Sequence, residues 1–339
     1  MLHSYLYSKL SGFNIYDVDL DSVNVDVPFP VKDIRADVGN GYVASVINCH
    51  KIPLPLGKAA WFANMIRNPV QQDLFEWPLD VVEVDKDGSF YTCLVLKKNE
   101  YLGMKPIREL LYQPSMSEIL DWRDPFILTV CKNIVSAMET LHSHGYIYND
   151  FNIDNILYDP GTGKVLFKFN DSIRINGCRT KFDEVEREDI SPEFAPPYIY
   201  DNDKYDRYLS FESDNYQLAS ILFRLMIGKL PYEGMDLMNY GVVFDPFFDV
   251  DENAHAHYFE HYHEYPHFIF DENDKTNSLS HTSASELPKE RWKKLPDRVR
   301  QMFSGVLCQK TAEDLSAGHV PTAQEWLNAL SKLGKDAGK

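Results

Sequence analysis

The stretch Tyr146-Ile-Tyr-Asn-Asp150-Phe-Asn-Ile-Asp-Asn155-Ile-Leu decides how the rest of this sequence is interpreted. Before it, apolar residues recur at helical spacing from Ile127 to Leu141, which predicts a helix with one buried face. After it, the apolar run that starts at Ile156 predicts a strand. Asp150 and Asn155 therefore lie on a predicted loop between a buried helix and a strand, and they are the first candidate functional side chains.

Length, charge and cysteine content narrow the class of protein. The 339 residues carry a formal charge of −17, which disfavours nucleic-acid and anionic membrane partners. No apolar run reaches the roughly 18 residues of a membrane span, and the first ten residues lack the pattern of a signal peptide. The five widely spaced cysteines form no Cys-x-x-Cys pair, which is typical of reduced thiols. We expect a cytoplasmic protein.

The first hundred residues predict a short lead-in followed by strands. Residues 1–24 predict a short helix and an acidic stretch. Asn40-Gly41 precedes an alternating apolar run and predicts a two-residue hairpin turn. A helix is expected over residues 58–67, because Asn68-Pro69 would end it. Two further antiparallel strands are expected at residues 77–82 and 90–96.

The rest of the chain is predominantly helical in pattern. Residues 156–169 predict a small hairpin with a Pro-Gly-Thr-Gly turn. Residues 215–228 are apolar nearly all round, which indicates a helix buried on most sides. Residues 241–290 are acidic, aromatic and rich in histidine, and they predict an irregular insertion. Two helices are expected to close the chain, near residues 296–308 and 322–333.

Strands first and helices afterwards, with this loop between them, resemble a protein kinase. The resemblance covers roughly residues 25–332. It rests on four segments that resemble kinase motifs, at residues 141–150, 191–197, 213–220 and 227–234. Three more resemble a bacterial branch of kinase-like proteins, some of them fused to helix-hairpin-helix modules, at residues 77–80, 268–277 and 321–326.

The resemblance implies an α+β, two-lobed fold. A small antiparallel β lobe would span residues 25–97, after the lead-in of residues 1–24. A larger, mostly helical lobe would span residues 98–335 and include the irregular insertion.

In kinases the loop Asp accepts the proton of the substrate hydroxyl and the Asn binds a metal ion. The resemblance therefore implies that Asp150 is a catalytic base and Asn155 a magnesium ligand, with Asp214 bracing the loop. The alternative is that Asp150 and Asn155 only hold the loop through backbone hydrogen bonds, as buried polar side chains often do. Asn152 could add a third polar group.

The parts that bind phosphates in kinases are mostly missing. The expected position of the phosphate-covering loop, residues 28–37, contains no glycine. Ser45 stands where the third-strand lysine belongs, and Asn64 stands near the place of its glutamate partner. Lys51 or Lys58 could substitute for the lysine.

The metal-binding Asp-Phe-Gly motif has Lys168-Phe169-Asn170 as its counterpart when no gap is allowed. Lys168 would then place a cation where kinases bind a metal. A shifted register would instead make Asn170 or Asp171 the metal ligand. Both alignments stay open from the sequence.

The activation segment already carries acidic residues, and Asn149 replaces the arginine that pairs with a phosphate in many kinases. We therefore expect no phosphorylation switch. Pro197 replaces the glutamate of the terminal Ala-Pro-Glu, and the position of its arginine partner reads His319-Val320-Pro321. Loss of both partners is consistent, because one alone would leave an unpaired buried charge. The acidic residues are Glu184, Glu186, Glu188 and Asp189.

A histidine cluster lies in the predicted insertion. Some members are four residues apart and could bind zinc on a helix, but the interleaved tyrosines and phenylalanine favour packing. The cluster contains His255, His257, His261, His263 and His267.

These patterns predict a pseudokinase that acts as a binding or regulatory module for a protein partner, without a cofactor. The alternative is an active Ser/Thr phosphotransferase that uses ATP and Mg²⁺, with Asp150 as base and Asn155 plus Asn170 or Asp171 on the metal. A third possibility is a metal-dependent scaffold that uses the histidine cluster.

Overall fold

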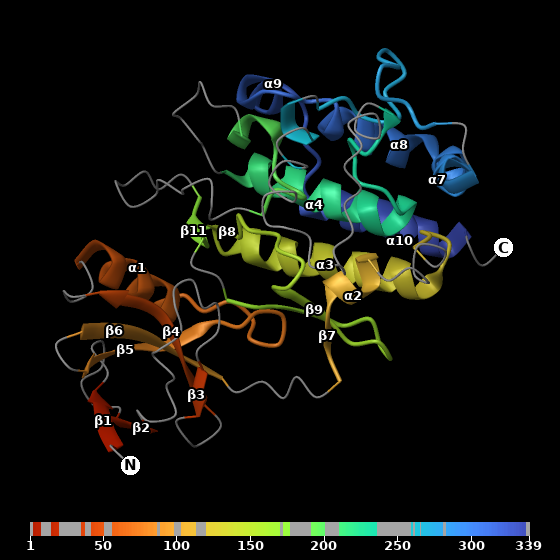
Figure 1. Cartoon of the computed structure of the whole chain (residues 1–339). Helices are drawn as coiled ribbons and strands as arrows, with labels where there is room; N and C mark the ends of the chain where they lie inside the picture. The colour runs from red at the N-terminus through yellow and green to blue at the C-terminus, as the bar shows by residue number, and fades with distance from the viewer. Residues whose placement is uncertain are drawn as a thin grey trace. The chain divides into compact units, whose positions relative to one another are not determined.

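The computed structural model divides the chain into two compact units (Figure 1). The smaller unit contains Met1–Leu102 and Leu166–Asp171, and the larger contains Gly103–Val165 and Ser172–Lys339. The lobe boundaries expected from the sequence stay a prediction. The structure describes residues 3–7, 15–19, 35–37, 42–50, 56–86, 89–97, 103–112, 120–169, 172–176, 191–200, 210–235, 259, 262–264, 266–280 and 283–336.

The smaller unit begins with a pair of antiparallel strands, β1 (His3–Tyr7) and β2 (Ile15–Asp19). The short helix expected within residues 1–24 is therefore wrong for both segments. Tyr16 and Val18 alternate with acidic residues, and this period of two fits a strand better than a helix.

A four-stranded antiparallel sheet forms the rest of the smaller unit, in the order β3-β4-β6-β5. The strands are β3 (Arg35–Asp37), β4 (Tyr42–His50), β5 (Pro78–Lys86) and β6 (Ser89–Lys97). Helix α1 (Leu56–Arg67) ends directly before Asn68-Pro69, as the sequence predicts.

Strands β3 and β4 pair antiparallel, with Asp37 opposite Val43, as expected for the two arms of a hairpin. The two-residue turn predicted at Asn40-Gly41 lies outside the described residues and stays a prediction.

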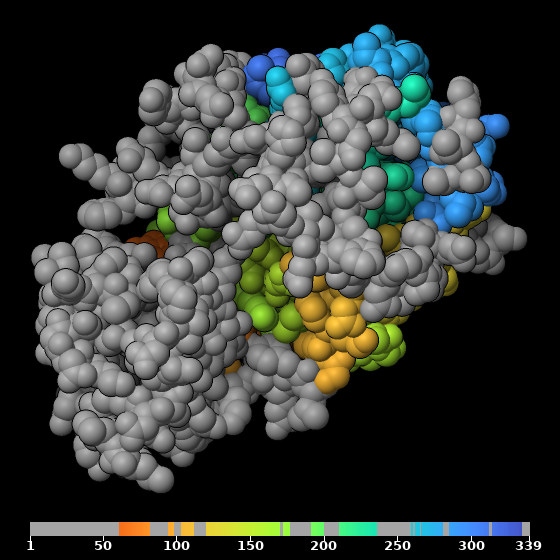
Figure 2. Space-filling model, viewed as in Figure 1, coloured from red at the N-terminus to blue at the C-terminus, as the bar shows by residue number. Residues whose placement is uncertain are grey.

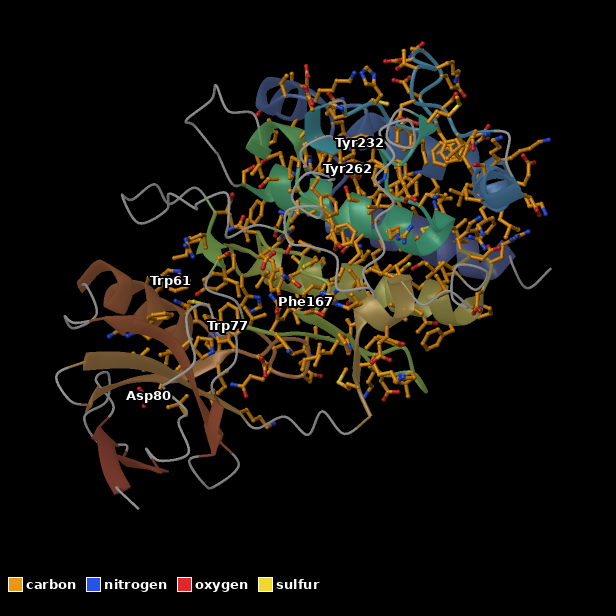
Figure 3. All side chains as sticks on the ribbon, viewed as in Figure 1. Trp61, Trp77, Asp80, Phe167, Tyr232 and Tyr262 are labelled. Carbon is orange, nitrogen blue, oxygen red and sulfur yellow. The ribbon has the colours of Figure 1, made fainter. Side chains whose placement is uncertain are left out.

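Trp77 anchors α1 within the smaller unit. Its side chain is 1% exposed, and its indole N–H donates to the Met65 carbonyl over 2.8 Å (Figure 3). Phe75 stacks on Phe167 with ring centroids 5.2 Å apart. Backbone hydrogen bonds from Phe167 to Leu74 and from Glu76 to Phe167, both of 2.8 Å, join the same segments.

The larger unit is mostly helical and is centred on α4 (Phe211–Ile227). The Ser210 side chain caps the start of α4, and Gly228, at a φ of 85°, ends it. Helix α3 packs against both α4 and α10 (Figure 1). The other helices are η2 (Pro197–Tyr200), α2 (Ile107–Tyr112), α3 (Pro125–Ser143), α7 (Ser283–Lys294), α8 (Asp297–Leu307), α9 (Ala312–Ala317) and α10 (Ala323–Asp336).

Short strands complete the larger unit. Strand β7 (Lys105–Pro106) pairs antiparallel with β9 (Ile156–Tyr158), and α2 lies beside β9 on the surface shown in Figure 2. The predicted hairpin after β9 is present, because the Asp159 N–H donates to the Lys164 carbonyl before β10 (Val165–Phe167) begins. Strand β8 (Tyr146–Ile147) pairs with β11 (Arg174–Ile175).

The two predicted closing helices are confirmed as α8 and α10. The prediction of an irregular insertion over residues 241–290 is wrong at its C-terminal end, because helix α7 begins at Ser283. Its spaced charge pairs, Glu286 with Lys289 and Glu290 with Lys294, support a helix that apolar periodicity does not reveal. Residues 236–258 lie outside the described chain.

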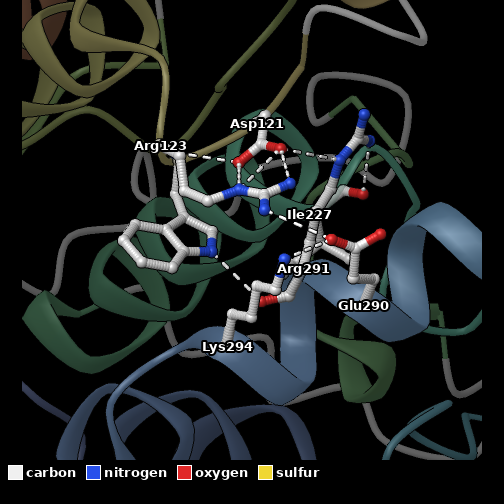
Figure 4. A network of polar contacts seen from close by, with 7 residues as sticks. Asp121, Arg123, Ile227, Glu290, Arg291 and Lys294 are labelled. Carbon is white, nitrogen blue, oxygen red and sulfur yellow. Dashed lines mark hydrogen bonds and ion pairs between the residues drawn. The ribbon is translucent and has the colours of Figure 1, made fainter. Parts of the chain in front are cut away.

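A polar network joins the segment before α3 to α7 (Figure 4). Arg291 is 2% exposed, donates to the Ile227 carbonyl over 3.1 Å, and lies 3.5 Å from Asp121. Burial raises the pKa of Asp121, but hydrogen bonds from Arg123 and the charge of Arg291 more than offset this and lower it. Among the described helices, none combines the length and hydropathy that crossing a bilayer requires.

Candidate functional site

The candidate loop starts where α3 ends. Gly145 follows the helix cap at a φ of 80°, and its N–H donates to the His142 carbonyl over 2.9 Å. Glycine adopts this left-handed conformation without a steric penalty, so the chain can reverse here and enter β8.

Asp214 of α4 holds the next two residues. Its carboxylate is fully buried and accepts the N–H groups of Tyr148 and Asn149, each over 2.8 Å. The ring Nε2 of His142 lies 2.9 Å from the same carboxylate. A buried carboxylate with several donors is strongly held, so α3, α4 and the loop form one polar unit.

Asn149 has the only positive φ among the described non-glycine residues, 65°. Asparagine tolerates this conformation better than most residues. Its side-chain amide donates to the Ser172 carbonyl over 2.6 Å, and its own N–H is bound by Asp214. The residue that replaces the phosphate-pairing arginine is therefore built into the loop.

The structure brings Asp150 and Asn155 together. The Asn155 amide nitrogen lies 3.4 Å from Asp150 Oδ2, and the Ser191 N–H donates to Asp150 Oδ1 over 3.0 Å. Asp150 is only 6% exposed. This arrangement gives a covered carboxylate with an amide beside it.

Asn152, predicted as an additional polar group, shapes the loop. Its Oδ1 accepts the Asp154 N–H over 2.8 Å, and its carbonyl accepts the Asn155 N–H over 2.9 Å. These short-range bonds define a turn that presents Asn155 towards Asp150.

Other contacts at the loop have no signal in the sequence. Arg108 of α2 forms a two-pronged ion pair with Asp154, a residue 46 positions away in the chain. Gln217 Oε1 accepts the Phe151 N–H over 3.3 Å. His263 Nε2 donates to the Pro192 carbonyl over 2.7 Å, across 71 positions. Only the folded chain brings these partners together.

The smaller unit contains Ser45 and Asn64, the residues that the sequence prediction places at the kinase Lys–Glu pair. Ser45 lies within β4, paired in register with Arg35 and Leu94. Strand β4 contains no lysine, and α1 contains no acidic residue. In α1, Asn64 Oδ1 accepts a hydrogen bond of 2.7 Å from Asn68. Lys58 lies in α1, and Lys51 lies outside the described residues.

The segment after β10 is attached to residue 76. The Phe169 N–H donates to Glu76 Oε2 over 3.3 Å. Lys168 precedes it and is half-buried. Asn170 and Asp171 lie outside the described residues, so the choice between Lys168 and a shifted register stays a prediction, as do their roles as ligands.

The histidine cluster is described only in part, since His255, His257 and His261 lie outside the described residues. His263 contacts Pro192, whereas His267 pairs with Asp274 and lies 3.2 Å from Lys310. Within the described ranges, no group of three His, Cys, Asp or Glu side chains could hold a metal ion. The acidic residues 184–189 also lie outside the described residues.

Comparisons with known proteins match this geometry to one family. The model of the protein kinase domain matches residues 91–326. Protein kinase YegI of Escherichia coli O157:H7 is 26% identical over 211 residues, which cover 59% of this chain and 31% of YegI. Casein kinase I homolog 2 of Saccharomyces cerevisiae is 26% identical over 153 residues, 41% of this chain and 28% of that protein. The chain thus spans about a third of the length of these curated relatives.

A solved structure shows the same fold. ROP2 from Toxoplasma gondii, described as a virulence factor with a protein-kinase fold and no enzymatic activity, superposes with a TM-score of 0.51 at 14% identity, covering 99% of this chain and 85% of ROP2. This likeness concerns the fold alone. With the α+β fold, the braced loop and the domain match together, this chain belongs to the protein kinase family, with bacterial protein kinases among its relatives.

Proposed function

We propose that this chain is a pseudokinase, a binding or regulatory module whose phosphotransfer is weak or absent. The observation that carries the proposal is the composition of β4 and α1. In kinases a lysine of this strand and a glutamate of this helix form the ion pair that positions the phosphates. Here β4 offers Ser45 and no lysine, and α1 offers Asn64 and no acidic residue.

The family implies ATP and Mg²⁺, and the described residues fit this pair poorly. An uncharged hydroxyl at Ser45 cannot replace the Coulomb attraction of an ammonium for a phosphate. Magnesium prefers carboxylates and phosphate oxygens, and Asn155 offers only a neutral amide oxygen.

Thermal unfolding with and without MgATP tests the proposal. A ligand at about 100 times its dissociation constant stabilises by about 2.7 kcal/mol, which is a shift of the thermal midpoint of roughly 4 °C in a chain of this size. We expect a shift below about 1 °C, within the scatter of such scans. ATP without magnesium is the matched control. A magnesium-dependent shift of several degrees would contradict the proposal.

The active-kinase alternative has one favouring observation. Asp150 and Asn155 lie 3.4 Å apart on a loop that Asp214 holds in place, which is the constellation of a base beside a metal ligand. Transfer of labelled phosphate from ATP to a protein substrate would support it, if Asp150→Asn abolished the transfer and Asp154→Asn did not. The absence of transfer above the Asp150→Asn background is the expected result.

The partner of such a module is proposed to be a protein in the cytoplasm. The formal charge of −17 supports this, because it disfavours nucleic acid and anionic lipid surfaces. Retention of full-length chain on immobilised DNA or RNA at physiological salt, against an acidic control protein, would contradict it.

A further inference from the structure

The segment that binds Asp150 is itself bound by a histidine of the insertion. Ser191, Pro192 and Glu193 are consecutive, and the Ser191 N–H donates to Asp150 Oδ1 over 3.0 Å. The carbonyl of the next residue, Pro192, accepts a hydrogen bond of 2.7 Å from His263 Nε2. Two adjacent backbone groups thus connect the candidate base to a histidine from the His-rich stretch.

His263 is well placed to hold this segment. It is 7% exposed, and it lies in a helical turn with Tyr262. Tyr262 packs on Tyr232 with ring centroids 5.1 Å apart, and the Tyr232 hydroxyl donates to the Leu307 carbonyl over 3.1 Å. Figure 3 shows Tyr232 and Tyr262 near one another. The turn that carries His263 is therefore fixed to the core of the larger unit.

The chemistry of the contact requires a donor. A carbonyl only accepts, so Nε2 of His263 carries a proton in this contact. Proline has no N–H and a fixed φ, so Pro192 can be held through its carbonyl alone while its ring stiffens the link to Ser191. Removing the imidazole would leave the Pro192 carbonyl without this donor, and the Ser191 amide would lose the restraint that keeps it at Asp150.

We propose that His263 is a positioning residue for Asp150: it clasps Pro192, so that the Ser191 amide stays bonded to the Asp150 carboxylate and the segment covers it. The clasp makes the accessibility of Asp150 depend on the insertion that bears His263. The clasp determines how well the Asp150 carboxylate is covered, and it does so whether or not the chain transfers phosphate.

Chemical labelling of carboxylates tests the clasp in the full-length protein. Brief treatment with a carbodiimide and glycinamide forms an amide on accessible carboxyl groups, which peptide mass spectrometry locates. We expect little label on Asp150 in the wild type and a several-fold increase in His263→Ala. Asp154, four residues further on and 47% exposed at its side chain, is the internal control and should label equally in both.

The conservative variant separates the hydrogen bond from the bulk of the ring. In His263→Gln the amide N–H can replace Nε2–H, so labelling of Asp150 should stay near the wild-type level. In His263→Asn the amide is too short to reach, and labelling should rise. Equal labelling of Asp150 in all three variants and the wild type would overturn the proposal, as would a rise of equal size at Asp154 and Asp150.

Hydrogen exchange provides a second readout, which stays decisive if His263→Ala fails to fold. The Ser191 amide should exchange several-fold faster in Asp150→Ala, which removes its acceptor, and in His263→Asn, but not in His263→Gln. An unchanged Ser191 exchange rate in His263→Asn would refute the clasp, even if MgATP binding showed the pseudokinase proposal to be wrong.

Discussion

The loop around Asp150 and the pair of β4 and α1 differ in the kinase features that their residues match. In the loop, Asp214 binds two backbone N–H groups and approaches His142, while Asn152 and Asn155 fix the turn. Strand β4 contains Ser45 and no lysine, and α1 contains Asn64 and no acidic residue. On the proposed function, residues that hold the backbone in place are kept, and the charged residues that act on phosphate are lost. Fold and chemistry are therefore separable within one family.

The largest expected loss of stability comes from removing the Asp214 carboxylate, which holds the loop in place. Asp214→Ala would leave the N–H groups of Tyr148 and Asn149 buried without their acceptor, and each such loss costs about 1–3 kcal/mol. We expect the free energy of unfolding to fall by about 3–5 kcal/mol, measured by urea denaturation. Asp297→Ala is the control, because its side chain is 83% exposed, and it should change stability by less than about 0.5 kcal/mol. A small effect of Asp214→Ala would break the comparison.

If the smaller unit lost only residues that act on phosphate, its core should still contribute to stability. Substitution of a buried side chain there should then lower the free energy of unfolding. Trp77→Phe removes a buried N–H that donates to Met65 over 2.8 Å, and it should cost about 1–3 kcal/mol beyond the packing loss. Trp326→Phe is the matched control: this indole is fully buried, and its N–H has no acceptor within the described part of the chain. Urea unfolding followed by circular dichroism measures both. Equal losses would show that the Trp77 hydrogen bond contributes nothing.

The buried ion pairs of the larger unit should contribute to its free energy of unfolding, and Asp121 is the example. The folded-state pKa of Asp121 is lowered, so its contribution is present above the unfolded pKa and disappears as the pH falls through the folded one. Asp121→Asn should cost about 1–2 kcal/mol at pH 7, and the gap to the wild type should narrow below about pH 4. Glu286→Gln, at an exposed position, is the control for unfolding measured across this pH range. A gap that widens at low pH would contradict the assignment.

The smallest effect is expected at Ser45. If the hydroxyl has no role in phosphate binding, Ser45→Ala should leave the response of the thermal midpoint to MgATP unchanged, within about 1 °C. Thermal scans of the variant and the wild type, each with and without MgATP, measure this. A response in the wild type that Ser45→Ala removes would assign a nucleotide role to this residue.

The sequence predicts the parts of this molecule that rest on local patterns. Apolar periodicity gives α3 and α4, and motif spacing identifies Asp150, Asn155 and Asp214 before any coordinates are known. The sequence prediction fails in two places. Charge pairs support helix α7 where an irregular segment was predicted, and alternating residues form β1 and β2 where a short helix was predicted.

Contacts between distant segments could not be predicted at all. The Arg108–Asp154 ion pair and the His263–Pro192 hydrogen bond join residues that have no mutual signature in the chain. The β3–β4 register likewise depends on the pairing of whole strands.

Isothermal titration of the full-length protein with ATP and magnesium tests the central claim most directly. The account predicts no heat of binding at millimolar ATP, because β4 contains no lysine and α1 contains no acidic residue to pair with one. Submillimolar binding that requires magnesium and is lost in both Asp171→Ala and Asn155→Ala would contradict it, because it would show that the loop and the segment after β10 still form a working metal–nucleotide site.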